Sequence, residues 1–238
     1  MLRIVFPEGF TRFQMAQRIA AVNGIARRRR HVRTRLSPRS YLRLTASSRL
    51  PRRFGAPARR SLEGFLFPAL YDFTPRTGTK RLLKLQLQAF RREWKAVNLR
   101  YARSRNLTPY DVLTIASMIE EEVAAPSERR LVSAVIYNRL KARMPLGIDA
   151  TIRYALHVPP TRSLTESELH NATPYNTRLH LGLPPTPISN PGLASMRAAA
   201  HPAHRNYLYF VRKPDKKHHF FTASFSKFEH YKATHGYR

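Results

Sequence analysis

Three consecutive glutamates, Glu120, Glu121 and Glu122, are the side chains in this sequence best placed to do acid–base chemistry. They end a segment whose start carries helix signals, because Thr108 can cap a helix and Pro109 suits its first position. A helix turns by about 100° per residue, which gives this segment one apolar stripe. Glu121 then faces water, and Glu120 and Glu122 lie on the two edges of the stripe, which consists of Val112, Ile115, Ala116, Ile119 and Val123.

A glutamate on an apolar edge is partly shielded from water, which favours its protonated form and suits a proton donor near neutral pH. The competing interpretation is a solvated, charged helix face. Acids are scarce in this chain, with 14 Asp and Glu against 43 Lys and Arg, and the helix is otherwise almost uncharged. We therefore treat the glutamates as the candidate chemistry, although periodicity alone does not choose between Glu120 and Glu122.

Composition limits the other possibilities. A chain of 238 residues suits one large domain or two small ones, and a hydrophobic content of 42% is enough for a core. We expect no transmembrane anchor and no signal peptide, since no apolar run or cleavage pattern is visible. Without cysteine there is no disulfide and no thiolate chemistry. The histidines are scattered and no phosphate-binding loop is present, so we expect no metal and no cofactor.

The net charge of +29 is concentrated at the start of the chain. Residues 1–60 hold sixteen arginines, no lysine and one acid, Glu8. Between residues 26 and 60 the aromatic residues are Tyr41 and Phe54 alone, and no periodicity is visible, unlike in nucleic-acid modules. We expect a poorly ordered basic segment that binds polyanions without specificity. One hypothesis is that this stretch is read in a shifted frame.

The remaining patterns predict an α+β fold. A strand at residues 4–6 and a turn precede a helix that opens near Thr11 and breaks at Gly24. Further helices are expected at 79–97, from Pro126 to about residue 140, after Asp149, and at 225–233. Residues 206–211 and 218–222 should form a β-hairpin. A long loop rich in Pro, Gly and Asn follows Thr173, and such loops often hold ligand contacts.

Several longer motifs resemble the MltG-type (YceG-like) endolytic murein transglycosylases. The matching stretches are LEGFLFPALY (62–71), LTIASMIEEE (113–122), the run from Ser127 to Leu156, TPYNTRLHLGLPPTPISNPG with the helix after it (173–202), YLYFV (207–211) and HHFFT (218–222). The first residues resemble the start of a LysM-like part. Gly147 and Ala150 depart from the family, which usually has Gln and Pro there.

The resemblance implies two parts: a LysM-like, Arg-rich piece at 1–60 and a lysozyme-like catalytic domain at 61–238. It implies cleavage of the β-1,4 bond between MurNAc and GlcNAc with formation of a 1,6-anhydro end, and Glu120 matches the catalytic glutamate. Glu122 matches a second family carboxylate. Substrate-binding candidates are Glu63, Asn138, Asp149, Tyr175, Asn176 and Thr177, although Glu63 suits a buried structural anion better.

The resemblance also implies the periplasmic face of a bacterial inner membrane as the location, peptidoglycan glycan strands as the partner, and peptidoglycan synthases as possible companions. Three rival functions remain open at this point. They are a muramidase-type hydrolase, a wall-binding protein without turnover, and a basic nucleic-acid-binding protein. No specific nucleic-acid partner is expected.

Overall fold

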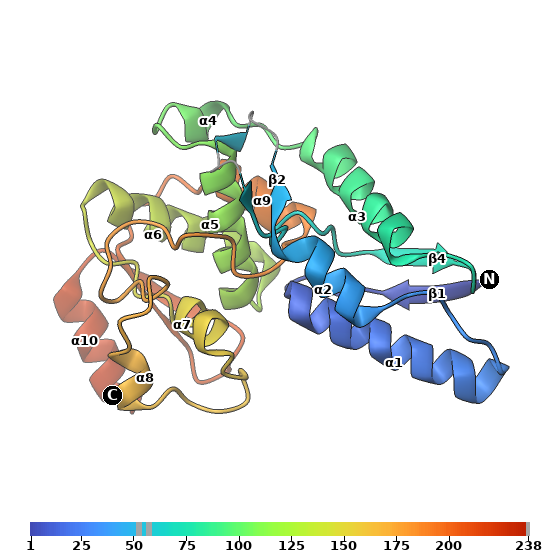
Figure 1. Ribbon diagram of the computed structural model, residues 1–238. Coiled ribbons are helices and arrows are strands. Elements are labelled where there is room, and N and C mark those ends of the chain that lie inside the picture. Colours follow the sequence, from blue (N-terminus) through green and yellow to red (C-terminus); the bar gives the residue numbers. More distant parts are fainter. Residues whose placement is uncertain (51–53, 56–58, 237–238) are drawn as a thin grey trace.

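The computed structural model describes residues 1–50, 54–55 and 59–236. The expected α+β class is confirmed, with helices and short antiparallel strand pairs (Figure 1). In chain order the elements are β1 (Leu2–Val5), α1 (Arg12–Arg30), α2 (Pro38–Ala46), β2 (Ser48–Arg49), β3 (Arg59–Arg60), β4 (Leu70–Phe73), α3 (Thr79–Trp94), α4 (Arg100–Arg103), α5 (Pro109–Glu122), a 3-10 turn (Pro126–Glu128), α6 (Arg129–Lys141), α7 (Asp149–Leu156), α8 (Glu166–Leu169), α9 (Leu193–Ala200), β5 (Tyr209–Arg212), β6 (His219–Thr222) and α10 (Phe225–Thr234).

The N-terminal lobe is built on a two-stranded sheet of β1 and β4. The strands are antiparallel, with Leu2 opposite Phe73 and Val5 opposite Leu70. Helix α1 contacts β1, α2 lies between α1 and α3, and α3 contacts β4 (Figure 1). This sheet crosses the expected boundary at residue 60, because β4 belongs to the part assigned to the second domain.

The structure differs from the expectation for residues 26–60. Helix α1 does not break at Gly24 but continues to Arg30, where His31 ends it in the left-handed conformation. Helix α2 follows, with Ser37 as its N-cap. Tyr41 is completely buried, and its hydroxyl donates a 2.8 Å hydrogen bond to Gln86 Oε1 of α3. The described part of the arginine-rich segment is therefore folded onto the rest of the lobe.

Burial of Tyr41 gives a test of this packing. Tyr41→Ala should lower the free energy of unfolding by about 3–5 kcal/mol, since it removes a fully buried aromatic ring. Arg43→Ala, at an exposed position of the same helix, should change it by less than about 0.5 kcal/mol. Urea unfolding of both variants measures the difference. Equal midpoints would mean that α2 is not packed in solution.

Helix α5 is the centre of the second lobe. Thr108 caps it as expected by accepting a hydrogen bond from the Asp111 amide, and Asp111 completes a capping box by accepting one from the Thr108 amide. Instead of one buried stripe, Tyr110 and every residue from Val112 to Ile119 are buried, because α9, α6 and α7 pack around the helix. The three glutamates are thus the part of this helix that leaves the core at its C-terminal end.

The C-terminal elements close the lobe on one side. The expected hairpin is confirmed: β5 and β6 pair antiparallel, with Tyr209 opposite Thr222. The expected closing helix is also confirmed as α10, which packs on both strands. Buried His219 of β6 lies 2.7 Å from a carboxylate oxygen of Glu128, so this contact fastens the hairpin to the turn before α6.

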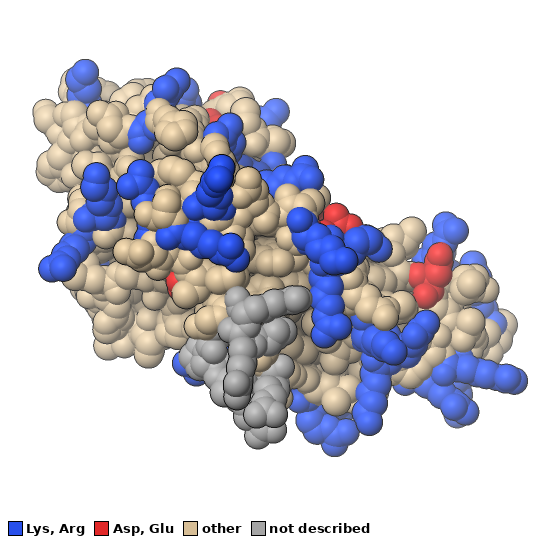
Figure 2. All heavy atoms as spheres, turned by 90° about the horizontal axis from the view of Figure 1, so that it is seen from above, with Lys and Arg blue, Asp and Glu red and all other residues tan. Residues whose placement is uncertain are grey.

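Basic side chains are not confined to the first sixty residues of the folded chain. Figure 2 shows one face of the molecule with Lys and Arg spread over both lobes and with few Asp and Glu side chains. No helix among the described residues is long and apolar enough to cross a membrane.

Candidate active site

A cavity of about 970 Å³ lies against the acidic end of α5, at the upper end of the size typical for small-ligand sites. The start of α1 and helix α7 form part of its wall, and the β5–β6 hairpin and α10 form another part. Glu121 and Glu122 both line it, whereas Glu120 is not among the lining residues. The end of α5 therefore presents Glu121 and Glu122 to the cavity, whereas Glu120 does not line it.

The two cavity glutamates resist ionisation. Burial, followed by the charge of Asp149, raises the pKa of Glu122 to about 7, against the opposing effect of Arg212. Shielding from water by the surrounding protein raises the pKa of Glu121 to about 7, and the neighbouring charges of Glu120 and Glu122 raise it further. Its surface is nevertheless exposed, since the side chain opens into the cavity. Both can hold a proton near neutral pH, as a general acid must.

Glu120 points toward the start of α9. Its Oε2 accepts a 2.8 Å hydrogen bond from the Gly192 amide, and its Oε1 lies 3.8 Å from Nη2 of Arg129. Only 7% of the Glu120 side chain is exposed. Arg129 is itself held by a 3.1 Å hydrogen bond from its Nε to Ser195 Oγ. Glu120 thus has a fixed orientation set by one backbone donor and one guanidinium group.

The loop between β1 and α1 covers this acidic end. Gly9 has a φ of +82°, and a Cβ atom on it would lie 3.1 Å from Glu121 Oε1 and 3.8 Å from Glu120 Cγ. The Gly9 amide donates to the Asn190 carbonyl, and the Asn190 amide donates to the Phe10 carbonyl. These two bonds fix the loop against the segment that precedes α9, so the N-terminal lobe contributes to the site.

Glu63 is completely buried beneath the same loop. It accepts hydrogen bonds from the Arg12 amide (2.9 Å), the Asn190 side-chain amide (2.6 Å) and the Tyr154 hydroxyl (3.2 Å). Burial is the main reason that its pKa rises to about 7. Glu63 therefore joins α1, α7 and the segment before α9 from inside.

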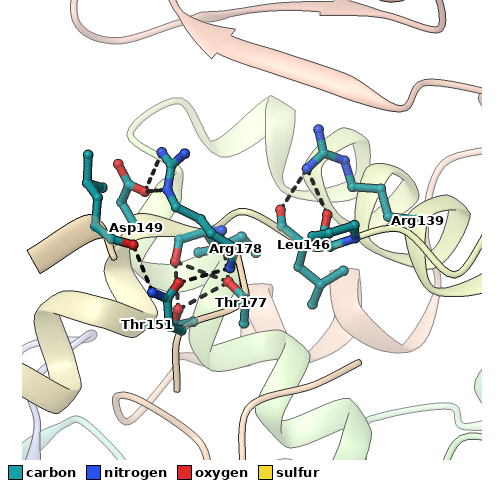
Figure 3. A network of polar contacts seen from close by, with 10 residues as sticks. Arg139, Leu146, Asp149, Thr151, Thr177 and Arg178 are labelled. Atoms are coloured by element: carbon teal, nitrogen blue, oxygen red, sulfur yellow. Dashed lines mark hydrogen bonds and ion pairs between the residues drawn. The ribbon is translucent and has the colours of Figure 1, made fainter. Parts of the chain in front are cut away.

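Asp149 and Thr177 belong to one network beside the cavity, shown in Figure 3. Asp149 lines the cavity and forms an ion pair of 2.7 Å with Arg178. Thr177 is buried, and its hydroxyl accepts a 3.0 Å hydrogen bond from the Ile148 amide and lies 3.2 Å from the Thr151 hydroxyl. Asp149 is thus available to a ligand, whereas Thr177 supports the wall from behind.

Asn138, Tyr175 and Asn176 lie outside the cavity lining. The Asn138 amide donates to the carbonyls of Arg205 and Tyr207. The buried Asn176 amide donates to the carbonyls of Leu169 and Asn171. Tyr175 pairs its hydroxyl with Thr186 and packs its ring on Tyr154. In the folded chain the polar groups of these three side chains hold loops in place, and their contact with a ligand stays a prediction.

The structure also brings residues to the site that the sequence did not single out. Glu8 and Arg129 lie beside Glu120, Tyr154 reaches Glu63, and Arg178 pairs with Asp149. The sequence contains one indication that Glu8 has a special role, because it is the only acid among the first sixty residues. The others required knowledge of which helices meet.

The fold as a whole is that of a solved relative. A crystal structure of a yceG-like protein from Listeria monocytogenes superimposes with a TM-score of 0.73 and 28% identity, covering 98% of this chain and 76% of that one. The family model for the YceG-like family matches residues 1–234. The chain therefore belongs to the YceG-like family. The match includes the arginine-rich segment, which argues against the shifted-frame hypothesis.

Curated relatives carry a more specific name. The endolytic murein transglycosylase of Bacillus subtilis is 37% identical over 161 residues, which are 67% of this chain and 44% of that protein. The protein of the same name from Streptococcus pneumoniae R6 is 36% identical over 160 residues, 65% of this chain and 28% of that protein. The matched region thus spans less than half the length of these curated relatives.

Proposed function

We propose that this chain is a lytic transglycosylase that cleaves the β-1,4 bond between MurNAc and GlcNAc inside peptidoglycan glycan strands. The observation that carries the proposal is the acidic end of α5, which meets a cavity of about 970 Å³ in a chain similar to endolytic murein transglycosylases. Peptidoglycan is then the substrate, and a LysM-like N-terminal unit and a lysozyme-like core are part of the same proposal. The β-α-α-β order of β1, α1, α2 and β4 supports the first of these.

In the proposed reaction Glu120 begins protonated and gives its proton to the oxygen of the leaving sugar. As a carboxylate it then takes the proton from the C6 hydroxyl of the muramic acid, whose oxygen attacks the anomeric carbon and closes the 1,6-anhydro ring. This intramolecular attack benefits from a large effective concentration and needs no positioned water. A hydrolase would need a second carboxylate to act on water or on the sugar.

The choice of Glu120 rests on the resemblance to the family motif, while the cavity geometry keeps Glu122 as the competing candidate. Glu122 lines the cavity and has a pKa of about 7, so it meets the physical requirement for an acid. Glu120 has the fixed hydrogen bond and the adjacent cation, which would stabilise the carboxylate produced after proton transfer.

The cavity walls suit a sugar chain. Phe13 of α1 and Phe225 of α10 are large apolar side chains with 36% and 59% of their surface exposed, and both line the cavity. Exposed aromatic rings in a cavity are a common ligand-binding feature, and the apolar faces of sugar rings can stack on them. The basic surface of Figure 2 suits an anionic wall polymer. We place the protein at the periplasmic face of the membrane, beside peptidoglycan synthases, on family resemblance.

Product analysis tests the proposal. The whole chain is incubated with purified peptidoglycan, and the released glycan fragments are identified by mass spectrometry. We expect 1,6-anhydro ends within strands. Reducing ends would show a muramidase instead. Binding to peptidoglycan without release of fragments, by a folded protein, would show a wall-binding protein, and salt-dependent DNA binding alone would favour the nucleic-acid interpretation.

A further inference from the structure

Glu8 lies against the same backbone atoms as Glu120. A Cβ atom on Gly192 would overlap the Glu8 carboxylate, and the three heavy atoms nearest to that position all belong to Glu8. The amide of the same glycine donates to Glu120 Oε2. Two carboxylates from opposite lobes therefore meet at one residue, at the start of α9.

The position of Glu8 is fixed by its loop. Neighbouring Gly9 bonds to the Asn190 carbonyl and touches the acidic end of α5, as described above. The Glu8 residue as a whole is exposed, and its carboxylate lies against Gly192. A group with this arrangement is open to a substrate or a proton and is not a core residue.

The charges at this point are unbalanced. Although the residue as a whole is exposed, the protein around the Glu8 carboxylate raises its pKa, the charge of Glu120 raises it further, and Arg129 opposes both effects. Arg129 is the cation that lies closest to Glu120 among the described ion pairs. Two nearby carboxylates that share one cation tend to retain one proton between them.

We infer that Glu8 is a positioning residue of the active site, a carboxylate supplied by the N-terminal lobe that keeps a proton on the Glu8–Glu120 pair. This inference rests on the proposed function, in which Glu120 must start protonated. It gives the N-terminal lobe a direct role in the reaction besides any role in binding the wall. It also gives a function to the contact between the Glu8 carboxylate and Gly192, which leaves no room for a side chain at position 192.

The test compares rates of anhydro-ended fragment release between pH 5 and pH 8 for the parent chain and for two variants. Glu8→Gln removes the charge and keeps the shape. Gly192→Ala keeps the charge and displaces the Glu8 side chain, because its Cβ overlaps only that flexible group among its nearest neighbours. Glu166→Gln, whose side chain is 88% exposed on α8, is the matched control.

Both site variants should stay folded, and the rate of each is expressed relative to its own rate at pH 5. At pH 8 they should lose roughly tenfold relative to the parent, which corresponds to a displacement of the basic limb by about one pH unit. The control should follow the parent at every pH. Profiles of Glu8→Gln and Gly192→Ala that superimpose on the parent profile would overturn the inference.

A second measurement separates this inference from the proposed function. Titration of 13C-labelled glutamate carboxyl groups by NMR, with signals assigned from the Glu8→Gln and Glu120→Gln variants, needs no activity. Coupled titration of the two signals in the parent, and a single uncoupled step for Glu120 in Glu8→Gln, would support the pair even in a chain that releases no product. Independent titration of the two signals in the parent would refute it.

Discussion

Replacing Glu120 by glutamine should reduce the release of anhydro-ended fragments by roughly 100- to 10,000-fold, the usual contribution of a general acid–base group. Glutamine keeps the size of the side chain, and its carbonyl oxygen can still accept the hydrogen bond from the Gly192 amide. The variant cannot donate a proton to the leaving sugar or remove one from the C6 hydroxyl. The loss should therefore appear in kcat, with little change in peptidoglycan binding.

Glu122→Gln and Glu121→Gln are the comparisons that decide the assignment. Both side chains line the cavity and have a pKa of about 7, so their replacement should alter the pH dependence and substrate binding. We expect each variant to retain at least one tenth of the parent rate. If Glu122→Gln abolishes turnover while Glu120→Gln retains it, the acid is the carboxylate that faces the cavity and the family-based assignment is incorrect.

Local signals in the sequence were sufficient for the elements that carry these glutamates. The start of α5 is defined by contacts within one turn, made by Thr108, Pro109 and Asp111. It could be predicted from the sequence because these contacts involve no distant residue. The β5–β6 hairpin could be predicted for the same reason. The helical wheel also placed Glu120 and Glu122 at partly covered positions and Glu121 at an exposed one, as the structure has them.

Long-range contacts account for what the sequence did not reveal. The pairing of β1 with β4 joins residues about seventy positions apart, and no local pattern encodes it. The arginine-rich segment looked disordered because its few apolar residues lack a period. Leu36, Tyr41, Leu50 and Phe54 are nevertheless all buried, and burial of a few large side chains is enough to fix a short helix between two others. Glu8 reaches Glu120 only after this lobe has folded.

Replacement of Glu63 should change the pH dependence of stability. The pKa of Glu63 is about 7 in the folded chain and 4.5 in the reference state. Between these values the native protein holds a proton that the unfolded chain has released, so stability falls as pH rises from about 4.5 to about 7 and is level above that. The group is fully buried, so its contribution to this fall is on the order of 3 kcal/mol.

Glu63→Gln should remove this contribution and keep the three hydrogen bonds, since its carbonyl can accept from the Arg12 and Asn190 amides and its amino group can donate to the Tyr154 hydroxyl. Relative to the parent, the variant should gain stability as pH rises from 5 to 7.5, measured by urea unfolding at several pH values. Glu63→Ala leaves buried donors without acceptors and should cost about 2–5 kcal/mol. Parallel stability curves for the parent and Glu63→Gln would show that Glu63 ionises normally within the fold, and that the junction between the two lobes tolerates its charge.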